Sequence, residues 1–349
     1  MPRRTEKSLL QSGLNSLIEV EVIRSLLDPA LLDDADYHTR LNEILILAQS
    51  IATLRYLNPR SVGSAGRLSI HDAITEFLNF PEDGFLVNFR MLPERFWALV
   101  EMLEARGGGD YWRTHPLSAA GGSSGRPVYQ QVAIALYILG SAGASFEKIR
   151  MKFNIGKGTT QVYLWRTVNL LAVLAPEYVQ WPTVDVRRQQ RRQQIDDAFN
   201  NCVGYLDGSE IPLRDRPMKD PEAYFSRKKT YGFNLQAICN QKGQFTYAHA
   251  GCTASAHDST AFKGTAFYQQ RQELLSNDEY ILGDKAYQVD KHIITPYKLP
   301  VARQSSYKAF NKAHSEHRIK VEHAFGVLKA RWLLDRTSVI LMWMHTCLG

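Results

Sequence analysis

The chain has 349 residues and a formal net charge of +7, which allows two or three compact domains and favours polyanionic partners, nucleic acid first among them. No apolar run approaches the roughly 18 residues of a membrane span, and the first residues lack the apolar core of a signal peptide, so a soluble, intracellular protein is predicted. The four cysteines show no CxxC pair and no Cys/His spacing typical of zinc sites, which excludes a zinc-finger class and predicts reduced thiols.

Two helical regions open the chain. Residues 1–87 show helical periodicity without a motif that indicates a chemistry, so they are predicted as a helical N-terminal region of unknown role. A second helical domain is predicted over residues 88–198. It begins in "FRMLPERFWALVEMLEARGGG", where apolar residues recur at helical spacing until a glycine run ends the helix.

Residues 145–175 have the pattern of a helix-turn-helix. Ser145 is placed to cap a first helix, "NIGKG" turns the chain, and Thr159 or Thr160 is placed to begin a second helix that would enter a DNA groove. Ordinary packing of two helices explains the same pattern, so both interpretations stay open. The candidate DNA contacts on the second helix are Lys157, Thr159, Thr160 and Gln161.

A basic helix follows in "VDVRRQQRRQQ" and links this domain to the next. Its spacing brings four arginines together on the helix, where they would contact a phosphate backbone or simply remain in solvent on a linker. These residues are Arg187, Arg188, Arg191 and Arg192.

From residue 199 the apolar periodicity shortens toward two, which is typical of strands. The segments "CVGYLDGSEIPL", "YGFNLQAICN" and "QFTYAHAGC" each predict a strand, "DSTAFKGTAFYQQRQELL" predicts a helix, and "YILGDKAY" predicts a fourth strand before a terminal helical run. Residues 199–349 are therefore predicted as a mixed α/β domain.

Three acidic residues are candidates for one site in this domain. Asp207 and Asp284 stand at the ends of the first and fourth predicted strands, and Glu322 lies in the terminal helix. If those strands are neighbours, the three side chains converge at one sheet edge. Such a cluster implies bound divalent cations or raised pKa values, and hard oxygen ligands suit Mg²⁺ or Mn²⁺. Taken alone, Asp207 also fits a turn and Glu322 a surface position.

A pair of such ions beside a basic surface fits phosphodiester chemistry. Asp258, at the start of the intervening helix, is either a helix cap or a further metal ligand. Four more basic residues near these acids are candidate phosphate contacts, with ordinary surface charge as the alternative. They are Lys228, Lys229, Lys329 and Arg331.

At these residues the chain resembles the PIF/Harbinger transposases and the nuclease-like proteins derived from them. The matching segments fall between residues 88 and 335 and include "LDGSEIPL", "SAHDSTAF", "YILGDKAYQVDKHIITPYK" and "FNKAHSEHRIKVEHAFGVLKARW". The resemblance implies an RNase H-like catalytic domain with a DDE acid set that binds divalent metal and cuts and joins DNA. On this chain it implies Asp207, Asp284 and Glu322 as the catalytic triad and Asp258 as a further metal ligand.

The resemblance also implies a nuclear protein that works with a Myb-like DNA-binding partner, and it leaves a homo-oligomer open. Glu210 stands where the family commonly has histidine, and "GCTASAHD" replaces the usual Trp-Pro-Gly block, but no acid is lost. Because the chain ends at "SVILMWMHTCLG", short of the family's C-terminal helix, a truncated catalytic domain is predicted. The alternative function is a domesticated or inactive transposase-derived DNA-binding protein without strand-transfer activity.

Overall fold

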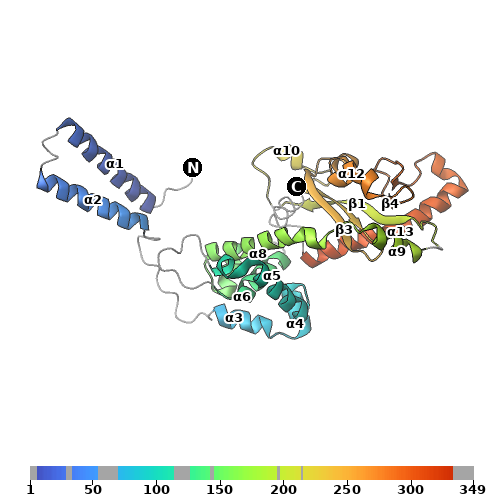
Figure 1. The fold of residues 1–349 in the computed structure, drawn as a ribbon, viewed down its shortest axis with the longest axis horizontal. Coiled ribbons are helices and arrows are strands. Elements are labelled where there is room, and N and C mark those ends of the chain that lie inside the picture. The colour runs from blue at the N-terminus through green and yellow to red at the C-terminus, as the bar shows by residue number, and fades with distance from the viewer. Residues whose placement is uncertain are drawn as a thin grey trace. The chain divides into compact units, whose positions relative to one another are not determined.

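The structure is a computed structural model that describes residues 6–28, 34–53, 70–113, 126–141, 145–194, 197–213 and 215–332. The chain divides into two compact units, one holding helices α1 and α2 and the other holding every element from α3 to α13 (Figure 1). Within the described ranges no helix combines the length and apolar character needed to cross a bilayer. The predicted C-terminal truncation concerns residues that lie outside those ranges.

The first unit is a pair of helices, α1 (Glu6–Leu27) and α2 (Ala35–Thr53). Leu14, Tyr37 and Ile51 are buried between them, and the Tyr37 hydroxyl donates to the carbonyl oxygen of Glu21 at 2.8 Å. The prediction of helices at the start of the chain is confirmed.

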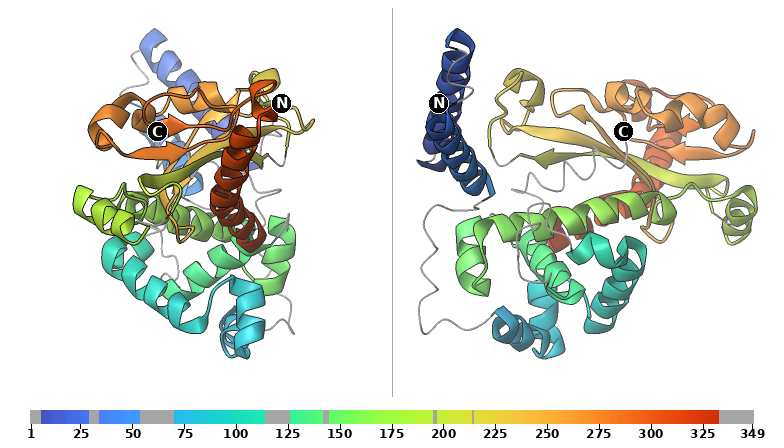
Figure 2. Two further views of the ribbon diagram at one scale, coloured as in Figure 1. Left: turned by 90° about the vertical axis from the view of Figure 1, so that its right-hand side faces the viewer. Right: turned by 60° about the vertical axis from the view of Figure 1, so that its left-hand side comes forward.

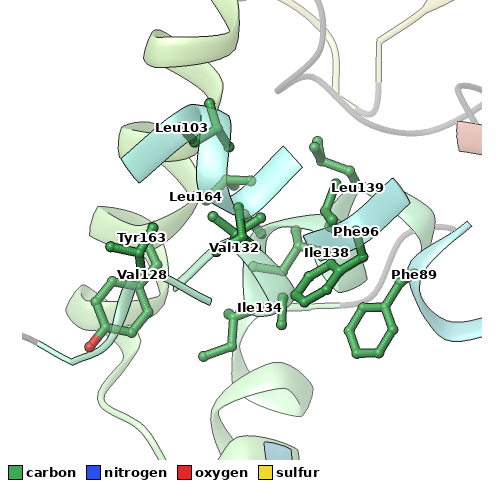
Figure 3. Close-up of a cluster of buried hydrophobic side chains, with 14 of the residues drawn as sticks. Phe89, Phe96, Leu103, Val128, Val132, Ile134, Ile138, Leu139, Tyr163 and Leu164 are labelled. Carbon is green, nitrogen blue, oxygen red and sulfur yellow. The ribbon is translucent and has the colours of Figure 1, made fainter. Parts of the chain in front are cut away.

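Six helices of the second unit share one hydrophobic core. They are α3 (Ile70–Leu78), α4 (Glu82–Phe89), α5 (Pro93–Arg113), α6 (Val128–Gly140), α7 (Phe146–Phe153) and α8 (Lys157–Tyr178). Helix α6 lies at the centre, because it is mostly apolar and almost every side chain on it is buried. Figure 3 shows Phe96 of α5 and Leu164 of α8 meeting the α6 side chains Val132 and Ile138.

Helices α7 and α8 have the predicted helix-turn-helix layout. Ser145 caps α7, since its Oγ accepts a hydrogen bond from the Lys148 N–H at 3.3 Å, and Asn154 turns the chain in the left-handed conformation with φ 49°. Helix α8 begins at Lys157, earlier than the sequence predicted, because the extended residue Gly156 serves as its N-cap. Thr160 therefore lies inside the first turn, where its Oγ1 donates to the Gly156 carbonyl oxygen at 3.1 Å.

The second unit continues through α9 (Val184–Arg192) into a five-stranded mixed sheet with the order β3-β2-β1-β4-β5. The strands are β1 (Cys202–Pro212), β2 (Gly232–Cys239), β3 (Phe245–Thr253), β4 (Tyr280–Leu282) and β5 (Ile293–Ile294). Strands β1, β2 and β3 pair antiparallel, whereas β4 runs parallel to β1 and β5 parallel to β4. The predicted neighbourhood of the first and fourth strands is confirmed.

Helices cover both faces of the sheet, because alternate residues of each strand point to opposite sides. On one face, helix α13 (Ser305–Trp332) packs against the sheet (Figure 2). Its residues Val321 and Phe325 share a buried cluster with Tyr205 of β1. On the other face, Phe262 and Phe267 pack with the next residue along, Leu206. This arrangement agrees with the predicted RNase H-like domain behind an all-helical region.

The helix predicted after β3 is two helices, α11 (Asp258–Lys263) and α12 (Ala266–Leu274). The break falls at Thr265, whose side chain accepts a hydrogen bond from the Tyr268 N–H at 3.2 Å and so caps α12. Short elements complete the unit, namely α10 (Pro221–Tyr224) and the 3-10 helix η2 (Val301–Arg303).

Candidate active site

Two aspartates lie side by side where β1 and β4 stop pairing. Tyr205 of β1 pairs with Leu282 of β4 in parallel register, and Asp207 and Asp284 each follow that pair by two residues. Neighbouring strands are about 4.8 Å apart, so both residues emerge at the same edge of the sheet, as the sequence predicted. Strand β1 itself does not end at Asp207, because its pairing with β2 continues to Pro212.

Asp284 is held by the turn that follows β4. The Ala286 N–H donates to Asp284 Oδ1 at 2.5 Å, and the Tyr287 N–H donates to the Asp284 carbonyl oxygen at 3.2 Å. A side-chain bond to the backbone two residues on is the usual way in which an aspartate fixes a turn. The turn therefore sets the orientation of the Asp284 carboxylate.

Asp207 is largely buried, and its pKa is raised above the ordinary value. Burial, against the opposing charge of the Arg318 guanidinium and with a smaller contribution from the charges of Asp284 and Asp258, raises the pKa of Asp207 to about 6. Arg318 Nη2, on α13, lies 3.1 Å from Asp207 Oδ1, and the Arg318 side chain is 11% exposed. Asp207 therefore interacts with both other aspartates across the sheet edge.

The raised pKa predicts how stability depends on pH. Because the folded chain favours the protonated Asp207 carboxyl, its contribution to stability is complete below the ordinary pKa of 3.8 and is lost as the pH rises through about 6. At pH 8 in EDTA, Asp207→Asn should therefore raise the free energy of unfolding by up to about 3 kcal/mol, a gain that shrinks toward pH 4. Urea denaturation at several pH values measures it, and a destabilised variant at pH 8 would contradict the prediction.

Asp258 is turned toward the sheet. His257 is the N-cap of α11, and Asp258 is its first residue. Asp258 Oδ1 accepts hydrogen bonds from Asn234 Nδ2 at 2.9 Å and from Gln236 Nε2 at 3.2 Å, both on β2. The sequence left two roles open for Asp258, a helix cap or a metal ligand. Asp258 does not cap α11, since His257 is the N-cap and Asp258 Oδ1 accepts hydrogen bonds from β2.

Glu322 lies on an exposed part of α13, one helical turn after Arg318. Within the described ranges, no three or more Asp, Glu, His or Cys side chains are arranged to hold a metal ion. The convergence of Glu322 with Asp207 and Asp284 therefore stays a prediction.

The acidic residues nevertheless suit a hard divalent cation. Asp207, Asp258 and Asp284 offer carboxylate oxygens, the ligands that Mg²⁺ and Mn²⁺ prefer, and their repulsion contributes to the raised pKa of Asp207. Arg318 supplies positive charge at this point, and its Nε is buried without a hydrogen-bond partner in the described part of the chain. A cation beside these carboxylates would relieve the same repulsion. The sequence analysis missed Arg318, although its spacing of four residues to Glu322 was a usable signal.

Two arginines of the basic helix lie away from solvent. The Arg187 side chain is 3% exposed, and its Nη2 lies 2.9 Å from Oε2 of the fully buried Glu279. Arg191 Nη1 lies 2.5 Å from Asp278 Oδ2. These contacts fasten α9 to the residues before β4, so Arg187 cannot be the phosphate contact that the sequence predicted. Arg188 and Arg192 are exposed, and Arg188 pairs with Asp185 of its own helix at 2.8 Å.

The candidate DNA contacts at the start of α8 also differ in their exposure to solvent. Lys157 and Gln161 are exposed and Thr159 is half-buried. Thr160 is fully buried and its hydroxyl bonds the Gly156 carbonyl, so it supports the helix and cannot contact a base. Three of the four predicted contacts on this helix therefore remain available.

A basic turn lies beside the Asp258 segment. Lys228 and Lys229 are exposed in the turn that the Ser226 N–H closes by donating to the Thr230 carbonyl oxygen at 2.8 Å. Arg227 of the same turn, which the sequence analysis missed, has its Nη2 2.8 Å from Nε2 of His257, the residue before Asp258. On the last turns of α13, Lys329 is half-buried and the exposed Arg331 lines an open groove with Lys242, Lys320 and His323.

Comparisons with known proteins agree with this arrangement. The family model described as DDE superfamily endonuclease matches residues 206–340, a range that contains all four acidic candidates. "Protein ALP1-like" of Arabidopsis thaliana is 27% identical over 240 residues, which cover 64% of this chain and 57% of that protein. "Putative nuclease HARBI1" of Mus musculus is 21% identical over 262 residues, 72% of this chain and 69% of that protein. The chain thus spans little more than half the length of the Arabidopsis relative. No solved structure matches it.

Proposed function

Because residues 206–340 match the DDE superfamily endonuclease family, we propose that this protein is a divalent-metal-dependent DNA endonuclease or transposase of the Harbinger type. The observation that carries the proposal is the parallel register of β1 and β4, which sets Asp207 beside Asp284 at one sheet edge. The Asp258 carboxylate lies against Gly208, the residue directly after Asp207, so a third acidic segment borders the pair.

The residues that would hold one or two metal ions are Asp207, Asp284, Glu322 and Asp258. When bound, Mg²⁺ or Mn²⁺ supplies Lewis-acid chemistry to the attacking and leaving oxygens of the phosphodiester. The chain itself supplies a rigid sheet edge for Asp207, a hydrogen-bonded turn for Asp284, and two amide donors that orient Asp258. Arg318 balances the charge of Asp207 from the opposite helix.

DNA is the proposed substrate because exposed basic groups border the acidic residues and the net charge is +7. The helix-turn-helix would bind DNA through the start of α8, and the basic turn beside Asp258 would contact phosphates near the site. The residues proposed for DNA contact are Lys157, Thr159, Gln161, Arg188, Arg191, Arg192, Lys228, Lys229, Lys329 and Arg331, with Arg227 added. A nuclear location, a Myb-like partner protein and a homo-oligomer belong to the proposal through the family resemblance alone.

A plasmid assay tests the proposal directly. The wild-type protein with supercoiled plasmid and millimolar Mn²⁺ should produce nicked and linear DNA, and excess EDTA should stop the reaction because the carboxylates alone cannot activate the nucleophile. Gel electrophoresis over time measures the rate. Cleavage that continues in EDTA, or none with either Mn²⁺ or Mg²⁺, would show that the proposal is wrong.

One observation favours a second function. Arg318 Nη2 lies 3.1 Å from Asp207 Oδ1, so an arginine pairs with the carboxylate that a metal ion would need, which suits a transposase-derived DNA-binding protein without strand transfer. Such a protein would bind DNA with a steep dependence on salt and would leave the plasmid intact with any divalent cation. Binding without cleavage in the plasmid assay would therefore select this alternative.

A further inference from the structure

The carboxylate of Asp258 lies at the end of a buried chain of hydrogen bonds. The Tyr287 hydroxyl donates to Gln236 Oε1 at 2.7 Å, and Gln236 Nε2 donates to Asn234 Oδ1 at 2.7 Å and to Asp258 Oδ1 at 3.2 Å. Asn234 Nδ2 completes the chain by donating to the same Asp258 oxygen at 2.9 Å. Gln236 is fully buried, and Tyr287 and Asn234 are only 3% and 7% exposed.

The donors and acceptors of this chain of hydrogen bonds run in one fixed direction. An amide oxygen can only accept a hydrogen bond and an amide nitrogen can only donate one, so the acceptor-only carboxylate of Asp258 turns Gln236 Nε2 toward itself and leaves Gln236 Oε1 to accept from the Tyr287 hydroxyl. With the amide reversed, its oxygen would face the carboxylate and the two would repel each other. Asp258 therefore orients the Gln236 amide, and the hydrogen bond from the Tyr287 hydroxyl holds the other end of that amide in place.

Gly208 of β1 leaves the space in which the Asp258 carboxylate lies. A Cβ atom at this position would collide with the Asp258 carboxylate and would lie 2.6 Å from Gln236 Nε2. The absence of a side chain thus lets the carboxylate rest against the backbone directly after Asp207. Both amides bond Oδ1, so neither of them engages Oδ2.

Tyr287 also connects the hydrogen-bond network around Asp258 to the turn that holds Asp284. Its own N–H donates to the Asp284 carbonyl oxygen at 3.2 Å, while its hydroxyl reaches Gln236 on β2. We propose that Tyr287 and Gln236 are positioning residues that hold Asp258 in place relative to Asp207 and Asp284 for metal binding. The inference rests on the proposed function, because it assigns the purpose of the network to the same metal site.

The test removes one hydroxyl group. Tyr287→Phe should raise the dissociation constant for Mn²⁺, measured by calorimetry on DNA-free protein, by about tenfold, and should slow plasmid cleavage by about 10- to 100-fold. Raised Mn²⁺ should restore part of the cleavage, since every carboxylate remains. DNA affinity in EDTA should stay unchanged, which a general loss of folding would not allow. The matched control is Tyr111→Phe, which removes a hydroxyl bonded to the Arg166 carbonyl oxygen at 2.7 Å in the helical region and should leave Mn²⁺ binding unchanged.

A second variant reaches Asp258 from the opposite side. Gly208→Ala leaves the Tyr287 hydroxyl intact but displaces the carboxylate, so it should weaken Mn²⁺ binding to a similar degree. If Tyr287→Phe or Gly208→Ala binds Mn²⁺ as tightly as wild type, or if Tyr111→Phe loses as much affinity, the positioning role is wrong while the nuclease proposal stands. A wild-type protein that neither binds Mn²⁺ nor cuts DNA would end both.

Discussion

Asp284→Asn is expected to lower Mn²⁺-dependent plasmid cleavage by about 10³-fold or more. The substitution removes a negative charge and a strong oxygen ligand from the position beside Asp207, and a metal ion that stabilises the transition state contributes several kcal/mol. Asparagine keeps the shape of aspartate, and its side-chain oxygen can still accept the hydrogen bond from the Ala286 N–H that fixes the turn. The fold should therefore survive while the activity disappears.

Initial rates of loss of supercoiled plasmid measure this effect at equal protein and Mn²⁺ concentrations. Asp83→Asn is the matched control, because Asp83 is an exposed carboxylate in the first turn of α4 within the helical core region. The control should cut at the wild-type rate, and both variants should bind DNA as wild type does in EDTA. Equal cleavage by wild type and Asp284→Asn would remove Asp284 from the site and leave the proposed chemistry without its central pair.

Glu279→Ala is expected to lower the free energy of unfolding by about 3 to 5 kcal/mol. Glu279 is fully buried, and its Oε2 accepts hydrogen bonds from Arg187 Nε at 3.0 Å and from the Ser276 N–H at 2.9 Å. Removing the carboxylate leaves the Arg187 guanidinium buried without its counter-charge, which costs far more than the pair contributes. A loss of this size should lower the melting temperature by roughly 10 °C.

Urea denaturation measures the change, and two comparisons identify its cause. Asp278→Ala breaks the neighbouring pair with Arg191, in which the Asp278 side chain is 58% exposed, and should cost less than about 1 kcal/mol. The double variant Arg187→Met with Glu279→Leu replaces the buried pair by apolar side chains and should recover most of the loss. If the double variant is as unstable as Glu279→Ala, the unpaired guanidinium is not the reason.

The sheet and its acidic edge could be predicted because both leave local signals in the sequence. Strands β1 and β4 are runs of apolar residues, and Asp207 and Asp284 interrupt them at equivalent positions. Ser145 could be identified as a helix cap for the same reason, since a cap depends on its immediate neighbours. Strand β5 was missed, because the two residues Ile293–Ile294 are too short to show alternation.

The partners of the buried polar residues could not be predicted, because they come from distant parts of the chain. Helical spacing shows that Arg187 and Arg191 share one side of α9, but it does not show whether that side meets solvent or Glu279, 92 residues from Arg187. Gln236 is an ordinary polar residue in a strand until α11 brings Asp258 over it. Arg318 likewise meets Asp207 only when α13 packs across β1, which its position in the sequence does not show.

The parallel pairing of β1 with β4 also determines at which stage of folding the proposed nuclease activity can arise. The connections within antiparallel β1, β2 and β3 are residues 213–231 and 240–244, whereas Tyr205 and Leu282 meet only after the chain closes a loop of roughly 75 residues. The entropy of closing that loop delays this contact relative to the local hairpins. Asp207 and Asp284 therefore become neighbours only in the completed sheet, and a partly folded or nascent chain should be unable to damage nucleic acid.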